Sequence, residues 1–549
     1  MSAGQRNRYI AAAVDASATR GVRAVLADIG GHLAPGRDDL PLVARQPSAD
    51  LAPPPELAVP DLLGAVYEAT LPSAERRRRG AFYTPAALAL ALARATLAGL
   101  PPGTRVWDPA VGGGALLLAA ARVLVGAGAD PATAVSAQVG GVDTDPLAVD
   151  VAATALGILG GAAPAHVAVG DGLSPPGGEW GAVIANPPFR GQLKRGTARS
   201  RDDAAALSDR FGSAAAGYAD DAGLFLLAAV EAVRAGGAVG FVLPAPLLAT
   251  RDARPVREAV GAKTTLVRLW APAATFDAGV RVVLAVARKE PPGPGATPAW
   301  GRGEWAVLAR GADGPPLPRL RSDGTVGDAA TVTADFRDQY YAVVAATREG
   351  GREGAPVVTC GLLDPARVLW GERPARIGRR SWSQPRAVLT GPAAAWGRQR
   401  LVPKVMVATQ TPVIEAAADE DGRWLPAVPV IAAEPRDVDV WALLAAMLAP
   451  AVSALARRRH AGAALSPDAI KLSAKQVAAL PLPADRAAWA AGAEAARAAT
   501  LAGRSGDIEG WQAALVVLGD AMDEAYASRA PAVRAWWWER VVRVGARGP

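Results

Sequence analysis

The chain has 549 residues, of which 51% are hydrophobic and 20% are charged, a balance typical of a folded globular protein. Its formal net charge of +7 permits a polyanionic partner without requiring one. One cysteine and three histidines argue against a disulfide framework and against a Cys/His metal site. Since there is no signal-peptide pattern and no unbroken apolar span, we expect an intracellular protein with no membrane segment and no metal ion.

The first 75 residues predict a helical arm, with two weak helical patterns on either side of a proline-rich connector at 52–55. The arm shows no acidic cluster of the kind that a nuclease needs. A basic run follows at 76–79, where we favour a solvated turn over a phosphate contact. Thr84 and Pro85 then suit the cap and the first position of the next helix.

A strand, a glycine-rich turn and a helix are predicted from residue 104 onward. The turn is D-P-A-V-G-G-G at 108–114, which matches neither the G-x-G-x-x-G of dinucleotide enzymes nor a P-loop. Glycines at a helix N-terminus let a ligand approach the backbone closely. Asp108 suits a ligand that carries an ammonium group or hydroxyls, although a tight turn alone would also explain the glycines.

Polar residues follow three further predicted strands. Asp143 occupies the place where such folds hold a ribose through its hydroxyls, and Asp171 follows the third strand. Asn186 follows the apolar run 182–185 and precedes Pro187, Pro188 and Phe189. Asn-Pro alone often marks nothing more than a strand that ends in a rigid turn. Four polar residues at four consecutive strand ends instead predict a ligand site at the carboxyl edge of a parallel sheet.

The chain after this point predicts a long polar segment, further strands and a change of domain. The polar stretch 190–219 suits a lid, a binding loop or disorder. Strands are predicted at 266–269 and 280–286, and Phe276 lies between them. The Pro/Gly-rich segment 291–298 predicts a linker.

The second half of the chain contains an unusually basic stretch. Residues 365–404 hold nine Arg or Lys against one acid, with three tryptophans interleaved. A solvated surface rarely needs this charge density, so nucleic-acid contact is the leading explanation. The candidate contacts are Arg376, Arg379, Arg380, Arg398, Arg400 and Lys404.

The order of these motifs resembles that of the gamma-class N6-adenine DNA methyltransferases over most of residues 60–290. It comprises G-A-F-Y-T-P at 80–85, the glycine turn at 108–114, Asp143, Asp171 and N-P-P-F at 186–189. Two departures, V-G-G-G at 111–114 for the frequent Cys-Gly-Ser-Gly and Leu116 for the frequent Phe, are conservative for a loop whose task is close backbone approach. A segment that ends in L-P-L-P at 480–483 is similar to the end of a target-recognition domain.

The resemblance implies an α/β fold, with a Rossmann-like S-adenosylmethionine-dependent methyltransferase domain and a C-terminal α+β target-recognition domain. We expect a helical arm at 1–75, the catalytic domain at 76–292, the recognition domain at 299–485 and a helical segment at 486–549.

The resemblance also implies roles for individual residues. In S-adenosyl-L-methionine binding, Thr84 and Asp108 would face the methionine end, Asp143 the ribose and Asp171 the adenine amino group. The full set of cofactor residues is Phe82, Tyr83, Thr84, Asp108, Ala110, Gly112, Gly114, Asp143, Asp171 and Asn186. Asn186, Pro187, Pro188 and Phe189 would form the catalytic motif, and Phe189 and Phe276 would stack on a flipped-out base.

We therefore expect methyl transfer to the N6 amine of adenine in a specific double-stranded DNA sequence. The setting would be a restriction-modification or phage-defence system in the cytoplasm, at the nucleoid, with a nuclease or defence proteins as possible partners. Three alternatives stay open. The chain could be an Asn-Pro-Pro methyltransferase for RNA guanine or protein glutamine, or a non-catalytic DNA-binding protein with a vestigial cofactor fold. It could also be a fused restriction-modification enzyme, which the short N-terminal arm disfavours.

Overall fold

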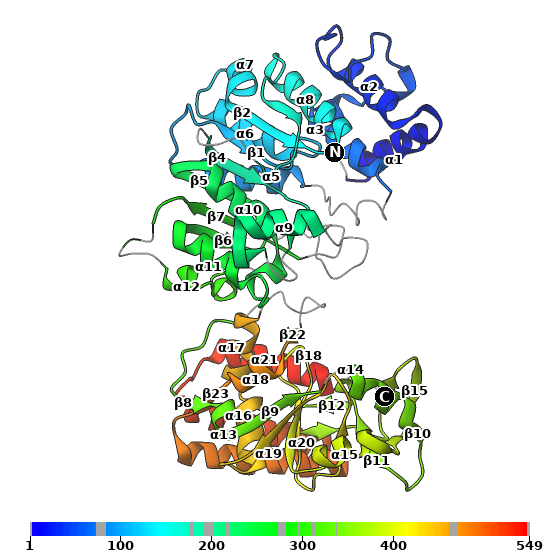
Figure 1. The fold of residues 1–549 in the computed structure, drawn as a ribbon, viewed down its shortest axis with the longest axis vertical. Coiled ribbons are helices and arrows are strands. Elements are labelled where there is room, and N and C mark those ends of the chain that lie inside the picture. Colours follow the sequence, from blue (N-terminus) through cyan, green and yellow to red (C-terminus); the bar gives the residue numbers. More distant parts are fainter. Residues whose placement is uncertain are drawn as a thin grey trace. The chain divides into compact units, whose positions relative to one another are not determined.

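Two units make up the chain, Met1–Ala312 and Asp313–Pro549 (Figure 1). The computed structural model describes residues 3–72, 84–174, 180–189, 201–215, 220–272, 281–291, 293, 297–309, 315–335, 337–460 and 469–545. The division falls beyond the expected linker. Trp300 and Trp305, expected at the start of the recognition domain, stack at 3.9 Å between ring centroids and belong to a core cluster of the first unit.

A seven-stranded sheet organises the first unit, in the order β3-β2-β1-β4-β5-β7-β6. Strands β1 to β5 run parallel, and β7 is antiparallel to both of its neighbours. Successive strands are added to one side of β1 up to β3 and to its other side from β4 onward. Open α/β sheets bind ligands at this switch point between β1 and β4. The strands are β1 Val106–Asp108, β2 Val139–Asp143, β3 Val167–Val169, β4 Trp180–Ala185, β5 Val233–Pro244, β6 Thr265–Trp270 and β7 Val282–Arg288.

Helices cover both faces of this sheet because its central strands are apolar on both sides. In β4, Ala182 and Ile184 pack into the core that holds α3, α5, α6 and α8, whereas Val183 and Ala185 pack towards α10 and α11. The helices are α5 Ala86–Leu97, α6 Ala115–Gly126, α7 Pro131–Thr133, α8 Pro146–Gly160, α9 Arg201–Phe211, α10 Asp221–Ala232, α11 Arg254–Lys263 and α12 Pro298–Gly301. Short turns of helix are η3 Ala134–Gln138, η4 Gly212–Ala214, η5 Ala245–Leu248 and η6 Trp305–Val307.

The N-terminal arm packs onto the same core. It consists of α1 Ala3–Arg20, α2 Val22–Leu33, η1 Ala49–Leu51, η2 Pro55–Leu57 and α3 Asp61–Thr70. Leu62, Leu63 and Val66 of α3 are buried with residues of α6 and α8. The arm is therefore part of the first unit's hydrophobic core.

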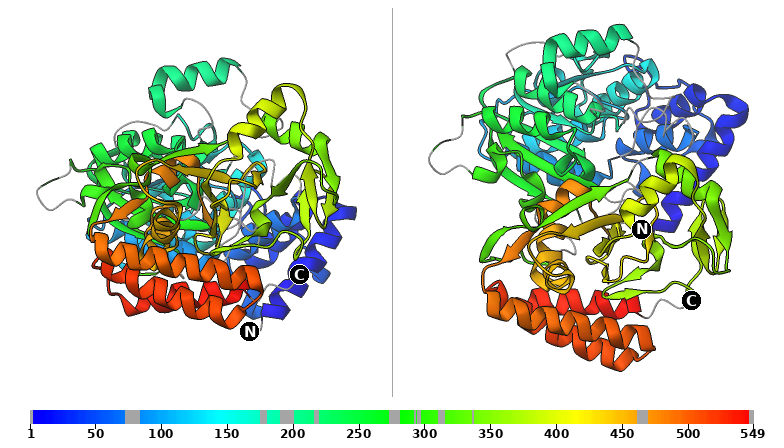
Figure 2. Two further views of the ribbon diagram at one scale, coloured as in Figure 1. Left: turned by 90° about the horizontal axis from the view of Figure 1, so that it is seen from below. Right: turned by 60° about the horizontal axis from the view of Figure 1, so that its bottom comes forward.

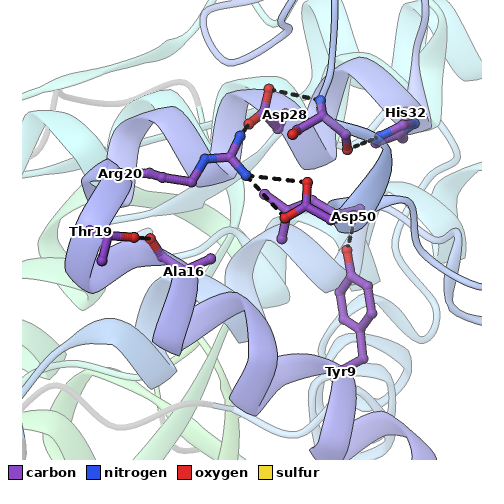
Figure 3. A network of polar contacts seen from close by, with 9 residues as sticks. Tyr9, Ala16, Thr19, Arg20, Asp28, His32 and Asp50 are labelled. Atoms are coloured by element: carbon purple, nitrogen blue, oxygen red, sulfur yellow. Dashed lines mark hydrogen bonds and ion pairs between the residues drawn. The ribbon is translucent and has the colours of Figure 1, made fainter.

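Polar contacts fix the arm internally (Figure 3). Arg20, at the end of α1, pairs with Asp28 of α2 and with Asp50 of η1. The Tyr9 hydroxyl donates to the Leu51 carbonyl at 2.7 Å, and burial raises the pKa of Tyr9 to about 12. These contacts join α1, α2 and η1 to one another and involve none of the polar residues at the ends of β1 to β4.

The second unit is built on a four-stranded antiparallel sheet, β19-β17-β21-β9, with a smaller sheet, β10-β16-β11-β20, formed largely by the segments between β9 and β21. The longer strands are β9 Ala330–Ala334, β11 Ala355–Val358, β17 Lys404–Val407, β19 Ala416–Asp419 and β21 Ile431–Pro435. The shorter ones are β8 Ser322–Thr325, β10 Thr347–Glu349, β12 Leu363–Asp364, β13 Arg367–Val368, β14 Ala375–Ile377, β15 Arg380–Trp382, β16 Pro385–Ala387, β18 Gln410–Thr411, β20 Leu425–Pro426, β22 Ile470–Lys471 and β23 Pro481–Pro483.

Helices of the C-terminal part complete the core of this unit. Residues of α16, α19, α20 and α21 share one hydrophobic cluster with β17, β19 and β21, and Figure 2 shows α19 and α20 side by side. The segment expected as separate after residue 485 is therefore packed into the second unit. The helices are α13 Val326–Ala329, α14 Arg337–Ala346, α15 Gly391–Arg400, α16 Val440–Leu448, α17 Pro450–Arg459, α18 Ala474–Ala478, α19 Arg486–Ser505, α20 Ile508–Ala525 and α21 Pro531–Gly545.

Two local features divide the helices of this unit. Helices α16 and α17 are separate because Pro450 lacks an N–H donor and starts a new helix. Strand β9 precedes α14 and is held by its pairing with β21. Within the described residues no single helix is long and apolar enough to cross a membrane; only the bent pair of α16 and α17 reaches that threshold jointly, and its residues are largely buried in the second unit.

Candidate active site

A cavity of about 480 Å³ lies at the carboxyl ends of β1 to β4. This volume is within the range of roughly 300–1,000 Å³ that small-molecule and cofactor sites occupy. The cavity brings together eight of the predicted site residues from far apart in the sequence. They are Thr84, Asp108, Ala110, Gly112, Asp143, Asp171, Asn186 and Pro188.

Asp108 is the most deeply buried acid of the cavity, with 1% of its surface exposed. Its Oδ1 accepts the Ala110 N–H at 2.9 Å, whereas its buried Oδ2 has no hydrogen-bond partner among the described residues. Burial raises the pKa of Asp108 to about 8; the Ala110 N–H opposes this rise and the nearby Asp143 adds to it. A buried carboxyl oxygen without a partner is costly, so this position favours a ligand that brings a cation or a donor.

The three glycines of the turn have three different surroundings. At Gly112 (φ +51°) an added Cβ would meet nothing within 4 Å, so this position is open for a ligand. At Gly113 an added Cβ would lie 2.7 Å from the Cα of Gly64 in α3. Gly114 (φ +85°) caps α6, and its Cβ would lie 3.1 Å from Ala152 of α8. Gly112 lines the cavity, while Gly114 does not line it and serves the packing of α6 against α8.

Asp143, at the end of β2, is held by two backbone donors. Its Oδ2 accepts the Gly112 N–H and its Oδ1 accepts the Asp145 N–H, each at 2.9 Å. Asp171, after β3, accepts the Leu173 N–H at 3.0 Å. Both carboxylates are thus oriented by the backbone at the edge of the cavity, where they can accept from hydroxyl or amino groups.

Asn186 lies at the end of β4 and donates from Nδ2 to the Thr84 Oγ1 at 2.9 Å. In this arrangement the amide nitrogen faces the threonine hydroxyl and the Oδ1 atom faces the other way. Pro188 lines the cavity, Pro187 is buried, and Phe189 is half-buried against the core of the first unit. Phe82, Tyr83 and Phe276 lie outside the described residues.

The structure adds lining residues that the sequence did not single out. Tyr67 and Glu68 come from α3, and Phe225 comes from α10. Tyr67 and Glu68 lie in a sequence pattern that predicts a helix, but the pattern does not indicate what that helix contacts. Phe225 lies in an apolar helix where a phenylalanine is normally core, and it is indeed 6% exposed. No local sequence signal distinguishes these positions from ordinary packing residues.

Much of the basic stretch of the second unit is internal. Lys404 is 0% exposed, and its Nζ lies 2.5 Å from Asp419 Oδ2. Burial lowers the pKa of Lys404, and Asp419 opposes that effect. Arg400, at the end of α15, lies 2.9 Å from Asp335. Both cations are held by internal acidic partners, so the nucleic-acid contacts expected of Lys404 and Arg400 stay predictions.

Other members of the stretch are also engaged. Arg373 pairs with the buried Asp364 at 3.2 Å, and Arg367 pairs with Glu372 at 3.2 Å. The Trp370 ring nitrogen donates to the Pro385 carbonyl at 3.0 Å. The tryptophans Trp370, Trp382 and Trp396 pack against one core cluster of the second unit. Arg376, Arg379, Arg380 and Arg398 remain exposed.

Three of these four exposed arginines, Arg376, Arg379 and Arg380, lie on one hairpin, whereas Arg398 lies in α15. Strands β14 and β15 pair antiparallel, with Arg376 opposite Ser381 and Ile377 opposite Arg380. Ala375 and Ile377 of β14 point into the core while Arg376, between them, points outward. The hairpin is thus anchored on one face and positively charged on the other.

The sheet order, the glycine turn and the acids at successive strand ends define a Rossmann-like fold of the S-adenosylmethionine-dependent methyltransferase class. Residues 58–266 match the family model described as N-6 DNA Methylase. This match over residues 58–266 confirms the resemblance seen in the order of the motifs. A search of curated proteins finds no match.

Among solved structures, one match supports the fold. The Type IIL restriction-modification enzyme MmeI, solved in complex with DNA, has a TM-score of 0.54 at 14% identity, over 89% of this chain and 82% of that one. A putative class I S-adenosylmethionine-dependent methyltransferase from Listeria monocytogenes has a TM-score of 0.38 at 16% identity, over 53% and 91%. The methyltransferase subunit of a type I restriction-modification system from Streptococcus thermophilus has 0.33 at 22%, over 42% and 49%. Of these three, the MmeI match shows a shared fold.

Proposed function

We propose that this protein transfers a methyl group from S-adenosyl-L-methionine to the N6 amine of a flipped-out adenine in a specific double-stranded DNA sequence. The biological setting would be restriction-modification or phage defence. The observation that carries the proposal is one cavity that joins Asp108, Asp143, Asp171 and Asn186 within the region that matches the N-6 DNA Methylase family model.

The cavity residues suit the cofactor by charge and by space. The unpartnered Oδ2 of Asp108 would face the cationic methionine end together with Thr84, and Gly112 leaves room for it. Asp143 would accept from the ribose hydroxyls, and Asp171 from the adenine amino group. When bound, S-adenosylmethionine supplies an electrophilic methyl group on sulfur.

The chain's own residues would activate the target amine by orientation. The lone pair of an adenine amine is delocalised into the ring, which makes the nitrogen a poor nucleophile. Asn186 Oδ1 and the Pro187 carbonyl would each accept one N–H bond, which leaves the lone pair aimed at the methyl group. Thr84 fixes the Asn186 amide through its 2.9 Å bond. The amine nitrogen would gain the methyl group and release one of its protons to solvent water, and the rate gain would come from the two preorganised acceptors.

Access to this cavity requires that the base leave the duplex. Stacking on aromatic side chains offsets the lost base stacking, at roughly 1–3 kcal/mol per base. Phe189 and Phe276 are the proposed stacking residues. Arg376, Arg379, Arg380 and Arg398 are the proposed DNA contacts, because they combine exposure with positive charge.

The test is to express the chain and its Asn186→Ala variant in a host that lacks DNA methylation. Single-molecule sequencing of host DNA should find N6-methyladenine in one sequence motif with the wild type and none with the variant. If the DNA stays unmodified while labelled methyl groups enter RNA or protein, the substrate is instead an RNA guanine or a protein glutamine. A variant that methylates as well as the wild type would remove Asn186 from the mechanism.

A further inference from the structure

Helix α3, in the N-terminal arm, forms one wall of the cavity. Tyr67, Glu68 and Leu71 line the cavity from this helix and its C-terminal end. They lie three, four and seven residues after Gly64, so all four share one helical face. This face turns towards the glycine turn and the strand ends.

Two glycines allow α3 to lie directly against the glycine turn. An added Cβ on Gly64 would lie 2.7 Å from the Gly113 carbonyl oxygen, closer than real Cβ contacts allow. The converse also holds, since a Cβ on Gly113 would lie 2.7 Å from the Gly64 Cα. The helix and the turn are therefore in backbone contact, and the position of one determines the position of the other.

A chain of hydrogen bonds connects this helix to the acid at the end of β2. The Tyr67 hydroxyl donates to Asp145 Oδ2 at 2.9 Å. The other oxygen of Asp145 caps α8 by accepting the Leu147 N–H at 2.9 Å, and the Asp145 N–H donates to Asp143 Oδ1 at 2.9 Å. Asp143 Oδ2 in turn accepts the Gly112 N–H.

We infer that Tyr67 is a positioning residue for cofactor binding: from the N-terminal arm it holds the Asp143–Asp145 turn, and so sets the carboxylate that receives the ribose. This inference rests on the proposed function. Tyr67 is 4% exposed, so its hydroxyl has a fixed environment and its bond to Asp145 is not an incidental surface contact. On this inference the N-terminal arm is a functional part of the cofactor site.

The experiment compares Tyr67→Phe with Tyr9→Phe in the full chain. Both changes remove one phenol hydroxyl from a hydrogen bond in the same arm, but Tyr9 donates to the Leu51 carbonyl and does not line the cavity. Calorimetric titration with S-adenosylmethionine should give a Kd about 5-fold weaker for Tyr67→Phe, the loss that one hydrogen bond typically causes, and an unchanged Kd for Tyr9→Phe.

A second measurement tests whether Tyr67 acts on the ribose-binding carboxylate or only on the stability of the arm. Wild type and Tyr67→Phe are each titrated with S-adenosylhomocysteine and with its 2′-deoxy analogue. A positioning role requires that the penalty for the missing hydroxyl shrink in Tyr67→Phe, because the receiving carboxylate is already misplaced. An equal penalty in both proteins, or an unchanged Kd, overturns the inference while the proposed function stands. A wild type that binds no cofactor overturns both.

Discussion

Burial of an ionisable side chain has different consequences in the two units. In the first unit, Asp108 is buried at a strand end without a cationic partner among the described residues, and its pKa is raised to about 8. In the second unit, Lys404 and Asp419 are buried together, and Asp419 also accepts the Trp424 N–H at 3.0 Å. A buried ionisable group that the protein itself pairs is structural, whereas an unpaired one marks a candidate binding site. Substitutions in both units test this difference.

The largest effect is expected at the cavity, for Asn186→Ala. The loss of one of two preorganised acceptors should lower kcat for adenine methylation by about 10²–10³-fold, the cost of removing one such group in other enzymes. Cofactor Kd should stay within a few-fold of wild type, because Asn186 would act on the amine. Filter binding with labelled cofactor and a methylation assay on plasmid DNA provide the two numbers. A variant that loses cofactor binding and activity together would assign Asn186 to the pocket wall alone.

In the second unit, Lys404→Ala should act on stability. It leaves Asp419 buried with no counter-ion, which typically lowers the free energy of unfolding by about 3–5 kcal/mol. Arg379→Ala, an exposed neighbour in the same basic stretch, should change it by no more than about 0.5 kcal/mol. Urea denaturation followed by tryptophan fluorescence measures both. If Lys404→Ala unfolds at the wild-type urea concentration, the pair contributes no net stability.

Asp108→Asn should have a smaller effect that depends on pH. The folded pKa of Asp108 lies above its unfolded value, so between the two the folded state binds more protons and stability falls as pH rises. A cationic ligand needs the ionised form, so cofactor Kd should tighten by up to about tenfold per pH unit from pH 6 towards about 8 and then level off. Asp108→Asn should show a pH-independent Kd. The same slope in this variant would assign the titration to another group.

The sequence was enough to predict that the polar residues at the strand ends form one site, because the sheet topology determines where those ends lie. Once β1 to β4 are parallel neighbours, Asp108, Asp143, Asp171 and Asn186 must meet at one edge, whatever the loops do. The contribution of Tyr67 could not be predicted, because it depends on how α3 packs against the glycine turn, a tertiary contact with no local pattern.

The basic stretch at 365–404 shows the same dependence on tertiary contacts, here for the exposure of charged side chains. Residue type alone does not distinguish Arg380, which is exposed on a hairpin, from Lys404, which is buried in β17. The partners that decide the matter, Asp335 for Arg400 and Asp419 for Lys404, both lie outside the stretch. Charge density in a region of short strands therefore overestimates the surface available to a nucleic acid.

The smallest individual effects are expected on the β14–β15 hairpin. Alanine at Arg376, Arg379 and Arg380 together should leave the melting temperature unchanged, because all three side chains are exposed. DNA affinity should fall, and the slope of log K against log salt should become shallower by about 0.9 for each phosphate that the variant no longer neutralises. Arg400→Ala is the control from the same stretch: its ion pair with Asp335 is largely buried, so it should lower the melting temperature and leave the salt slope as it was. If the hairpin variant keeps the wild-type slope, its arginines do not bind the DNA backbone, and the DNA-binding surface of the second unit lies elsewhere.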